Sequence, residues 1–180
     1  MTAIDERSDA LHPAIVKTLV WRDESQTQHF AAALAAQPAL QHCFVALRGE
    51  LGAGKTTLVR HLLRALGIVG PVKSPTYALV ESYDVAPEPR GHPHLASAWP
   101  IWHFDFYRFA DPREWEDAGF RDLFAGPGLK IAEWPDKAAG LLPQVDLDVF
   151  IQVEPDACRH VRLVAKTATG AALLAGVTVC

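Results

Sequence analysis

The chain has 180 residues, of which 49% are hydrophobic and 21% are charged. These proportions are those of an ordinary globular protein, and the length fits one domain better than two. The formal net charge of −4 argues against electrostatic binding of nucleic acid over a broad surface, because such binding usually needs a basic face. A local basic patch remains compatible with this charge.

The N-terminus and the cysteines indicate an intracellular setting. The first residues are polar and acidic, and no uninterrupted apolar stretch approaches the roughly 18 residues that would span a bilayer. The cysteines are odd in number, widely separated and without metal-ligand spacing: Cys43, Cys158 and Cys180. We therefore expect a cytoplasmic protein with reduced structural thiols, and neither a membrane nor DNA as a partner.

The N-terminal part of the chain predicts strands and helices on either side of a glycine-rich loop. Residues 1–12 are polar and are expected to form a disordered tail. β-Branched runs, apolar runs and helix-stop residues predict a strand over 14–20, a helix capped by Asp23 or Ser25 and ended near Pro38, a buried strand over 43–47, and a helix that ends at Gly67.

The C-terminal part predicts a similar alternation. Its elements are a strand over 78–85, a Pro-rich loop over 86–94, a strand over 101–106, a helix from Asp111 to near Gly119, a strand over 129–133 with a short helix after it, and paired strands over 147–153 and 160–165. Asp111 is the expected N-cap, since Pro112 and Glu114 follow at the first and third helical positions. The apolar segment 169–180 predicts no definite structure.

The mixture of helices with buried central strands predicts an α/β fold. We expect a single P-loop NTPase domain over residues 13–168, built as a three-layer sandwich. Its central sheet should be mostly parallel, with a β-hairpin near the C-terminus.

The glycine-rich loop carries the clearest chemical signal. Residues 49–56 match the pattern Gly-x-x-x-x-Gly-Lys-[Ser/Thr], with a predicted strand before and a helix after. Glycines let successive backbone N–H groups turn inward, and the helix adds its positive N-terminal end. Lys55 is expected to span the β- and γ-phosphates of ATP, and Thr56 to bind Mg²⁺. The expected nucleotide-binding residues are Gly49, Glu50, Leu51, Gly52, Ala53, Gly54, Lys55, Thr56 and Thr57.

Two carboxylates follow other predicted strands. Asp105 ends the apolar run that begins at residue 101, and Glu133 ends the strand over 129–133. Ligands gather at the carboxyl ends of the strands in open α/β sheets, so parallel strands would bring both groups to the glycine loop. We expect Asp105 to hold Mg²⁺, and Glu133 to assist at the metal or orient the attacking water.

The order of these motifs resembles the TsaE family of bacterial ATPases in the biosynthesis of tRNA threonylcarbamoyladenosine (t6A). The similar segments, within roughly residues 15–155, are 49–57, Ser74-Pro75-Thr76-Tyr77, His103-Phe104-Asp105-Phe106-Tyr107-Arg108 and Glu133-Trp134-Pro135. Phenylalanine is common at the position of Tyr77, and leucine at that of Phe106. Both differences conserve bulk.

The resemblance implies slow hydrolysis of ATP, with ATP or ADP bound together with Mg²⁺. It implies TsaD and TsaB as partners in t6A formation on tRNAs reading ANN codons, with tRNA met mainly through that complex. It also implies that Thr76 faces the phosphates and that Trp134 lies beside the nucleotide. Arg108 is expected to contact phosphate or a partner, or to form a structural ion pair.

Other functions remain open from the residues alone. A small-molecule kinase would share the loop, but only Arg90 could serve as the arginine of its lid. A nucleotide-gated binding module would bind ATP without productive hydrolysis. A GTPase is disfavoured because the chain has no asparagine for an Asn-Lys-x-Asp segment. His92 and His94 invite a metal site, although a Pro-rich surface loop explains them more simply.

Overall fold

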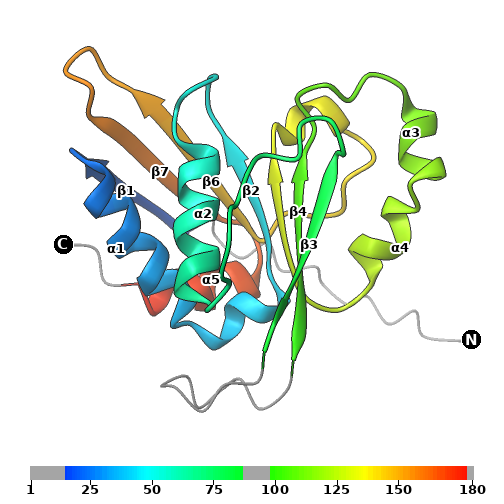
Figure 1. Ribbon diagram of the computed structural model, residues 1–180. Coiled ribbons are helices and arrows are strands. Elements are labelled where there is room, and N and C mark those ends of the chain that lie inside the picture. The colour runs from blue at the N-terminus through cyan, green and yellow to red at the C-terminus, as the bar shows by residue number, and fades with distance from the viewer. Residues whose placement is uncertain (1–14, 87–97, 178–180) are drawn as a thin grey trace, which may run out of the picture.

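The computed structural model describes residues 15–86 and 98–177 (Figure 1). The predicted tail over 1–12, most of the Pro-rich loop with its two histidines, and Cys180 lie outside this range. The sheet has the strand order β1-β7-β6-β2-β5-β4-β3. Its strands are β1 (Ile15–Trp21), β2 (Phe44–Arg48), β3 (Val80–Val85), β4 (Trp99–Asp105), β5 (Leu129–Glu133), β6 (Leu147–Val153) and β7 (Arg159–Ala165).

The centre of the sheet is parallel and its margins are antiparallel. Strands β6, β2, β5 and β4 pair in parallel with one another. Strand β7 runs antiparallel to both β6 and β1, and β3 runs antiparallel to β4. The predicted mostly parallel sheet is confirmed, and so is the hairpin, which the structure forms from β6 and β7.

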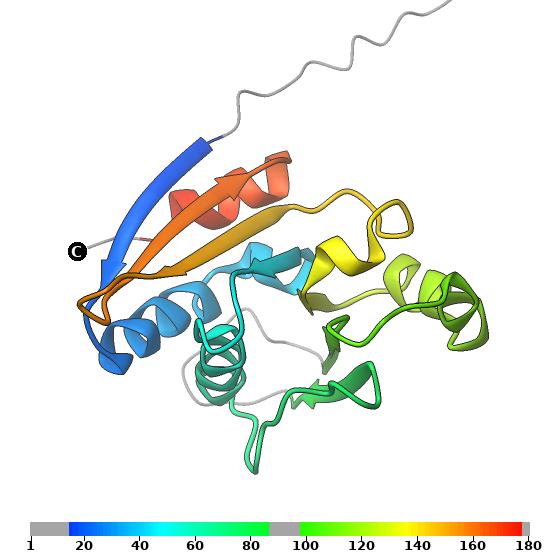
Figure 2. The same ribbon diagram turned by 90° about the horizontal axis from the view of Figure 1, so that it is seen from above.

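Helices cover both faces of the central strands. The helical elements are α1 (Glu24–Ala35), η1 (Pro38–His42), α2 (Lys55–Ala65), α3 (Pro112–Asp117), α4 (Phe120–Ala125), η2 (Pro135–Ala138) and α5 (Ala168–Ala175). Helices α1 and α2 lie on the same side of the sheet (Figure 2). Strand β2 alternates between the two cores, with Val45 and Leu47 facing α2, and Phe44 and Ala46 facing α3 and α4. The three-layer prediction is therefore confirmed.

Local signals account for several element boundaries. The Asp23 side chain accepts a hydrogen bond from the Gln26 N–H at 3.1 Å, so Asp23 is the cap of α1. The capping box predicted at Asp111 is present. The helix predicted from Asp111 is α3, and it ends just before Gly119, as expected. Gly119 adopts a φ of 64° and starts a second helix, α4, which the sequence did not predict.

The C-terminal segment is more regular than its composition indicated. Thr167 accepts a hydrogen bond from the Gly170 N–H and caps α5. Leu173 and Leu174 are buried in the same core as α1 and α2. The sequence missed this helix because its small apolar residues carry no helical periodicity, and the cap alone is a weak signal.

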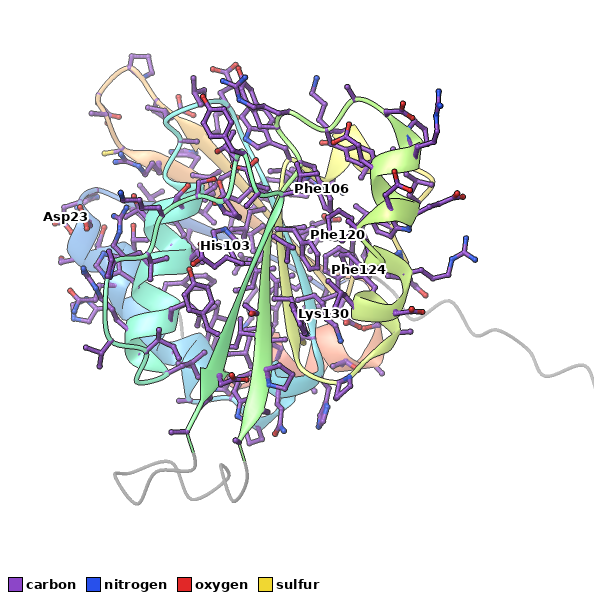
Figure 3. All side chains as sticks on the ribbon, turned by 45° about the vertical axis from the view of Figure 1, so that its right-hand side comes forward. Asp23, His103, Phe106, Phe120, Phe124 and Lys130 are labelled. Atoms are coloured by element: carbon purple, nitrogen blue, oxygen red, sulfur yellow. The ribbon has the colours of Figure 1, made fainter. Side chains whose placement is uncertain are left out.

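An aromatic cluster fills the space between β4 and α4. Phe104 stacks on Phe124 with ring centroids 4.6 Å apart, and meets Phe120 edge-on at 5.4 Å. Phe106 stacks on Phe104 at 5.7 Å. Figure 3 shows phenylalanines on the side of β4 that faces α4, with His103 on the opposite side. At the C-terminal end of β4, alternation thus puts Phe104 on the aromatic side and His103 and Asp105 on the other.

Two further features of the described residues are the lack of a membrane-spanning helix and the state of the cysteines. Among the described residues, no helix is long and apolar enough to cross a membrane. Cys43 and Cys158 form no disulfide. Burial, with a smaller contribution from Asp146, raises the pKa of the Cys43 thiol to about 12, so this thiol is a packing group.

The aromatic cluster predicts a stability effect at α4. Phe120→Ala removes a fully buried ring, and we expect the free energy of unfolding to fall by about 3–5 kcal/mol. Denaturant unfolding measures the change. The matched control is Arg121→Ala, the exposed next residue, which should change the free energy by less than about 0.5 kcal/mol. Equal effects of the two substitutions would contradict this packing.

Candidate functional site

The glycine loop connects the end of β2 to the start of α2. Gly49, Gly52 and Gly54 have φ values of 146°, 80° and 108°, which other residues rarely adopt. Gly49 is also restricted by close packing, because a Cβ there would lie 2.3 Å from the carbonyl oxygen of Ile151 in β6. The loop conformation therefore depends on glycine both for its turns and for the approach of the neighbouring strand.

Lys55 is held inside the loop. It is buried, and its Nζ donates to the carbonyl oxygens of Gly49 at 2.7 Å and Glu50 at 2.8 Å. The same ammonium lies 4.0 Å from the ring centroid of Trp134. Burial lowers the pKa of Lys55, while the charges of Glu133 and Asp105 oppose that change. A positive group is thus fixed beside two carboxylates.

Glu133, at the end of β5, contacts both the start of α2 and the neighbouring strand β4. The Thr56 hydroxyl lies 2.9 and 3.0 Å from the two carboxylate oxygens of Glu133. His103 in β4 donates from Nε2 to Glu133 Oε1 at 3.0 Å. Because β5 pairs directly with β2, Glu133 is the acid beside Thr56, and Asp105 lies one strand further away.

Asp105 accepts hydrogen bonds from the loop that precedes β3, which contains Ser74 and Thr76. Its Oδ2 accepts from the hydroxyl of Thr76 at 2.9 Å and also from the hydroxyl of Ser74. Its Oδ1 accepts from the Tyr107 N–H at 2.9 Å. Asp105 and Glu133 are paired in register on parallel strands, so both emerge at the same sheet edge, as expected.

These groups line one pocket of about 270 Å³. Its lining residues are Leu51, Gly52, Gly54, Lys55, Thr56, Thr57, Ser74, Thr76, Asp105, Tyr107, Glu133 and Trp134. Most of the predicted site residues are therefore together. Gly49 and Glu50 instead line the neighbouring hollows beside Arg48, and Ala53 is buried against the core.

The structure adds residues to which the sequence assigned no role. His103 and Ser74 stood inside recognised motifs, and strand alternation would have put His103 on the same face as Asp105. Arg159 contacts the glycine loop from β7, and nothing in the sequence indicated that contact. Arg108, for which the sequence predicted a contact with phosphate or a partner or a structural ion pair, lies over the ring of Tyr77, 4.6 Å from its centroid.

The pocket fits a phosphate group with a divalent cation by the chemistry of its donors. The loop and the first turn of α2 provide backbone N–H groups for an anion. A hydroxyl from Thr56 and carboxylates from Asp105 and Glu133 are the oxygen ligands that Mg²⁺ prefers. Within residues 15–86 and 98–177, no three His, Cys, Asp or Glu side chains form a metal cluster.

The chain is similar to proteins of one family. The family described as "Threonylcarbamoyl adenosine biosynthesis protein TsaE" matches residues 21–161. The TsaE of Haemophilus influenzae is 45% identical over 126 residues, covering 70% of this chain and 72% of the relative. The TsaE of Bacillus subtilis is 32% identical over 151 residues, covering 83% of this chain and 87% of the relative. Both are named tRNA threonylcarbamoyladenosine biosynthesis proteins.

A solved structure agrees on the fold. The crystal structure of Bacillus subtilis YdiB matches with a TM-score of 0.69 and 24% sequence identity, and the match covers 91% of this chain and 95% of that one. The fold is thus that of a P-loop NTPase with a seven-stranded sheet. Since the family match covers the glycine loop, both carboxylates and most of the sheet, the chain belongs to the TsaE family.

Proposed function

We propose that this protein is a slow, Mg²⁺-dependent ATPase that acts in t6A biosynthesis on tRNA. The observation that carries the proposal is the convergence of Lys55, Thr56 and two carboxylates in one pocket at the N-terminus of α2. The names of the relatives support the t6A role. ATP and ADP are the proposed nucleotides.

Nucleotide binding would change the hydrogen-bond partners of residues in the pocket. Lys55 would transfer its hydrogen bonds from two loop carbonyls to the β- and γ-phosphates. Thr57 would reach the α-phosphate, and Trp134 would pack beside the nucleotide. Because Lys55 already has partners, the gain on binding is the difference between two sets of hydrogen bonds rather than their full value.

Thr56, Asp105 and Glu133 would hold the metal side of the site. Mg²⁺ bound there would neutralise charge that develops on the phosphates. Through its hydrogen bonds to Ser74 and Thr76, Asp105 would hold their loop against the pocket, so that Thr76 would face the phosphates. The donor set lacks a third carboxylate, so we expect the metal to bind together with the nucleotide rather than alone.

Glu133 would orient the attacking water and accept its proton as the bond to the terminal phosphate breaks. Attack by water on the γ-phosphorus releases ADP and inorganic phosphate. Glu133 suits this task because it is buried and its carboxylate is fixed by Thr56 and His103. His103 Nδ1 is buried without a hydrogen-bond partner in the described structure, which leaves Nε2 as the nitrogen that carries the proton.

We propose TsaD and TsaB as the partners, with tRNA met mainly through them. The surface around the pocket is compatible with a protein contact, because Leu51, which lines the pocket, and Tyr77, which follows the lining residue Thr76, are exposed by 76% and 84%. Hydrolysis would then reset the partner complex between rounds of threonylcarbamoyl transfer.

The first prediction from the proposed function concerns Lys55. Lys55→Ala should raise the Kd for ATP by at least about tenfold, because it removes charge-assisted hydrogen bonds to phosphate. Isothermal titration calorimetry measures the change. Arg64→Ala, an exposed residue of the same helix, is the control and should bind as the wild type does. Wild-type affinity in Lys55→Ala would remove this pocket as the phosphate site.

The second prediction separates the two carboxylates. Asp105→Asn should lose the difference in ATP affinity between Mg²⁺ and EDTA buffers, because it removes a metal-side charge. Glu133→Gln, whose amide oxygen can still accept from Thr56, should keep part of that difference and lower kcat by about 100-fold or more. Titration calorimetry and phosphate release measure the two quantities. A wild-type protein that binds ATP yet never releases phosphate would support a binding module, and transfer to a small acceptor would support a kinase.

The third prediction concerns the t6A role. Adding the protein with ATP to TsaB, TsaD, a threonylcarbamoyl donor and tRNA should give several t6A per partner complex. Omitting it, or supplying Glu133→Gln, should limit the yield to about one round. Nucleoside analysis of digested tRNA measures t6A. An equal yield without the protein would contradict the role, whatever its ATPase activity.

A further inference from the structure

The tip of the β6–β7 hairpin packs against the glycine loop. The hairpin turn is well ordered by its own bonds, since Glu154 N–H donates to Cys158 O and Ala157 N–H donates to Glu154 O, both at 2.9 Å. Ile151 in β6 lies against Gly49, as described above. Arg159 begins β7 directly after the turn. Strands β6 and β7, which lie far along the chain from the glycine loop, thus pack against one side of it.

The Arg159 side chain connects the hairpin tip to the loop. Its Nε donates to the carbonyl oxygen of Ala53 at 3.2 Å, and its Nη1 donates to the carbonyl oxygen of Ala157 at 3.2 Å. The Nε also lies 3.4 Å from the position that a Cβ of Gly54 would occupy. The guanidinium therefore joins two backbone carbonyls, one on each side of the contact, and lies along the backbone of Gly54.

This contact controls the direction of one peptide group. A trans peptide is planar, so its C=O and its N–H point in opposite directions. The Ala53 carbonyl accepts from Arg159, so the N–H of the same peptide, which belongs to Gly54, points away from that side chain. Gly54 lines the pocket, whereas Ala53 is buried against the core. Holding the carbonyl at Arg159 thus restricts the directions that the Gly54 N–H can take at the pocket wall.

We propose that Arg159 is a positioning residue of the phosphate loop, which holds the peptide between Ala53 and Gly54 so that the Gly54 N–H faces a bound phosphate. The inference rests on the proposed nucleotide binding but adds a residue outside the loop. Gly54 can rotate easily because glycine tolerates many backbone conformations. A peptide next to glycine therefore needs an external bond to keep one orientation before the ligand arrives.

Arginine suits this task better than lysine. The guanidinium is a rigid planar fork that donates to two acceptors in fixed directions, whereas the three donors of an ammonium rotate on a flexible stem. If Arg159 acted only through its charge, lysine would replace it fully. If it acts by holding two carbonyls, lysine should replace it only in part.

The test compares full-length Arg159→Met, Arg159→Lys and Arg162→Met proteins. Arg162 is on the same strand and lies over the ring of Phe150, 4.0 Å from its centroid, so its substitution removes the same charge away from the loop. Calorimetry with ADP and with ATP in Mg²⁺ gives the affinities. The ¹H–¹⁵N resonance of Gly54 and its hydrogen exchange, measured without nucleotide, report the peptide itself. Thermal unfolding checks that each variant is folded.

We expect Arg159→Met to raise the Kd for ADP and ATP by about tenfold, because the peptide would then have the binding orientation in only about a tenth of the molecules. It should also shift the Gly54 resonance and speed its exchange. Arg159→Lys should recover only part of both effects, and Arg162→Met should match the wild type.

An unchanged Gly54 resonance, wild-type affinity in Arg159→Met, full rescue by lysine, or an equal loss in Arg162→Met would each overturn the inference. A wild-type protein that binds neither nucleotide would instead contradict the proposed function. In that case the Gly54 amide alone would decide the positioning role.

Discussion

The parallel pairing of β2, β5 and β4 is the constraint on which the rest of the site depends. Leu47 pairs with Glu133, and Glu133 pairs with Asp105, so three chain segments end in register at one edge of the sheet. Parallel strands require long connections between them, and these connections supply α2 and the aromatic layer. The same register that buries the apolar runs therefore brings the glycine loop and two carboxylates together.

The alternation of side chains along β4 then divides two tasks between its faces. Phe104 and Phe106 point to the aromatic cluster, while His103 and Asp105 point toward α2. The aromatic face contributes stability through burial, and the polar face contributes hydrogen bonds. Since both sets are on one strand, loosening the aromatic layer would also move the carboxylates.

The polar groups of the pocket are bonded to one another before any ligand binds. Lys55 is bonded to loop carbonyls, Thr56 to Glu133, and Thr76 to Asp105. Such bonds satisfy groups that are costly to bury alone, and they hold the side chains close to the geometry that a ligand would need. A ligand would exchange these bonds rather than create new ones.

The sequence by itself determined the α/β class, the glycine loop, the capping box at Asp111 and the two carboxylates, because each depends on short-range signals such as residue type, spacing and periodicity. It missed the helices α4 and α5, where local signals were weak. Only the tertiary structure decided that Glu133 rather than Asp105 contacts Thr56, and that Arg159 reaches Ala53. Both depend on strand order and hairpin packing, which arise between segments far apart in the chain, so no local pattern records them.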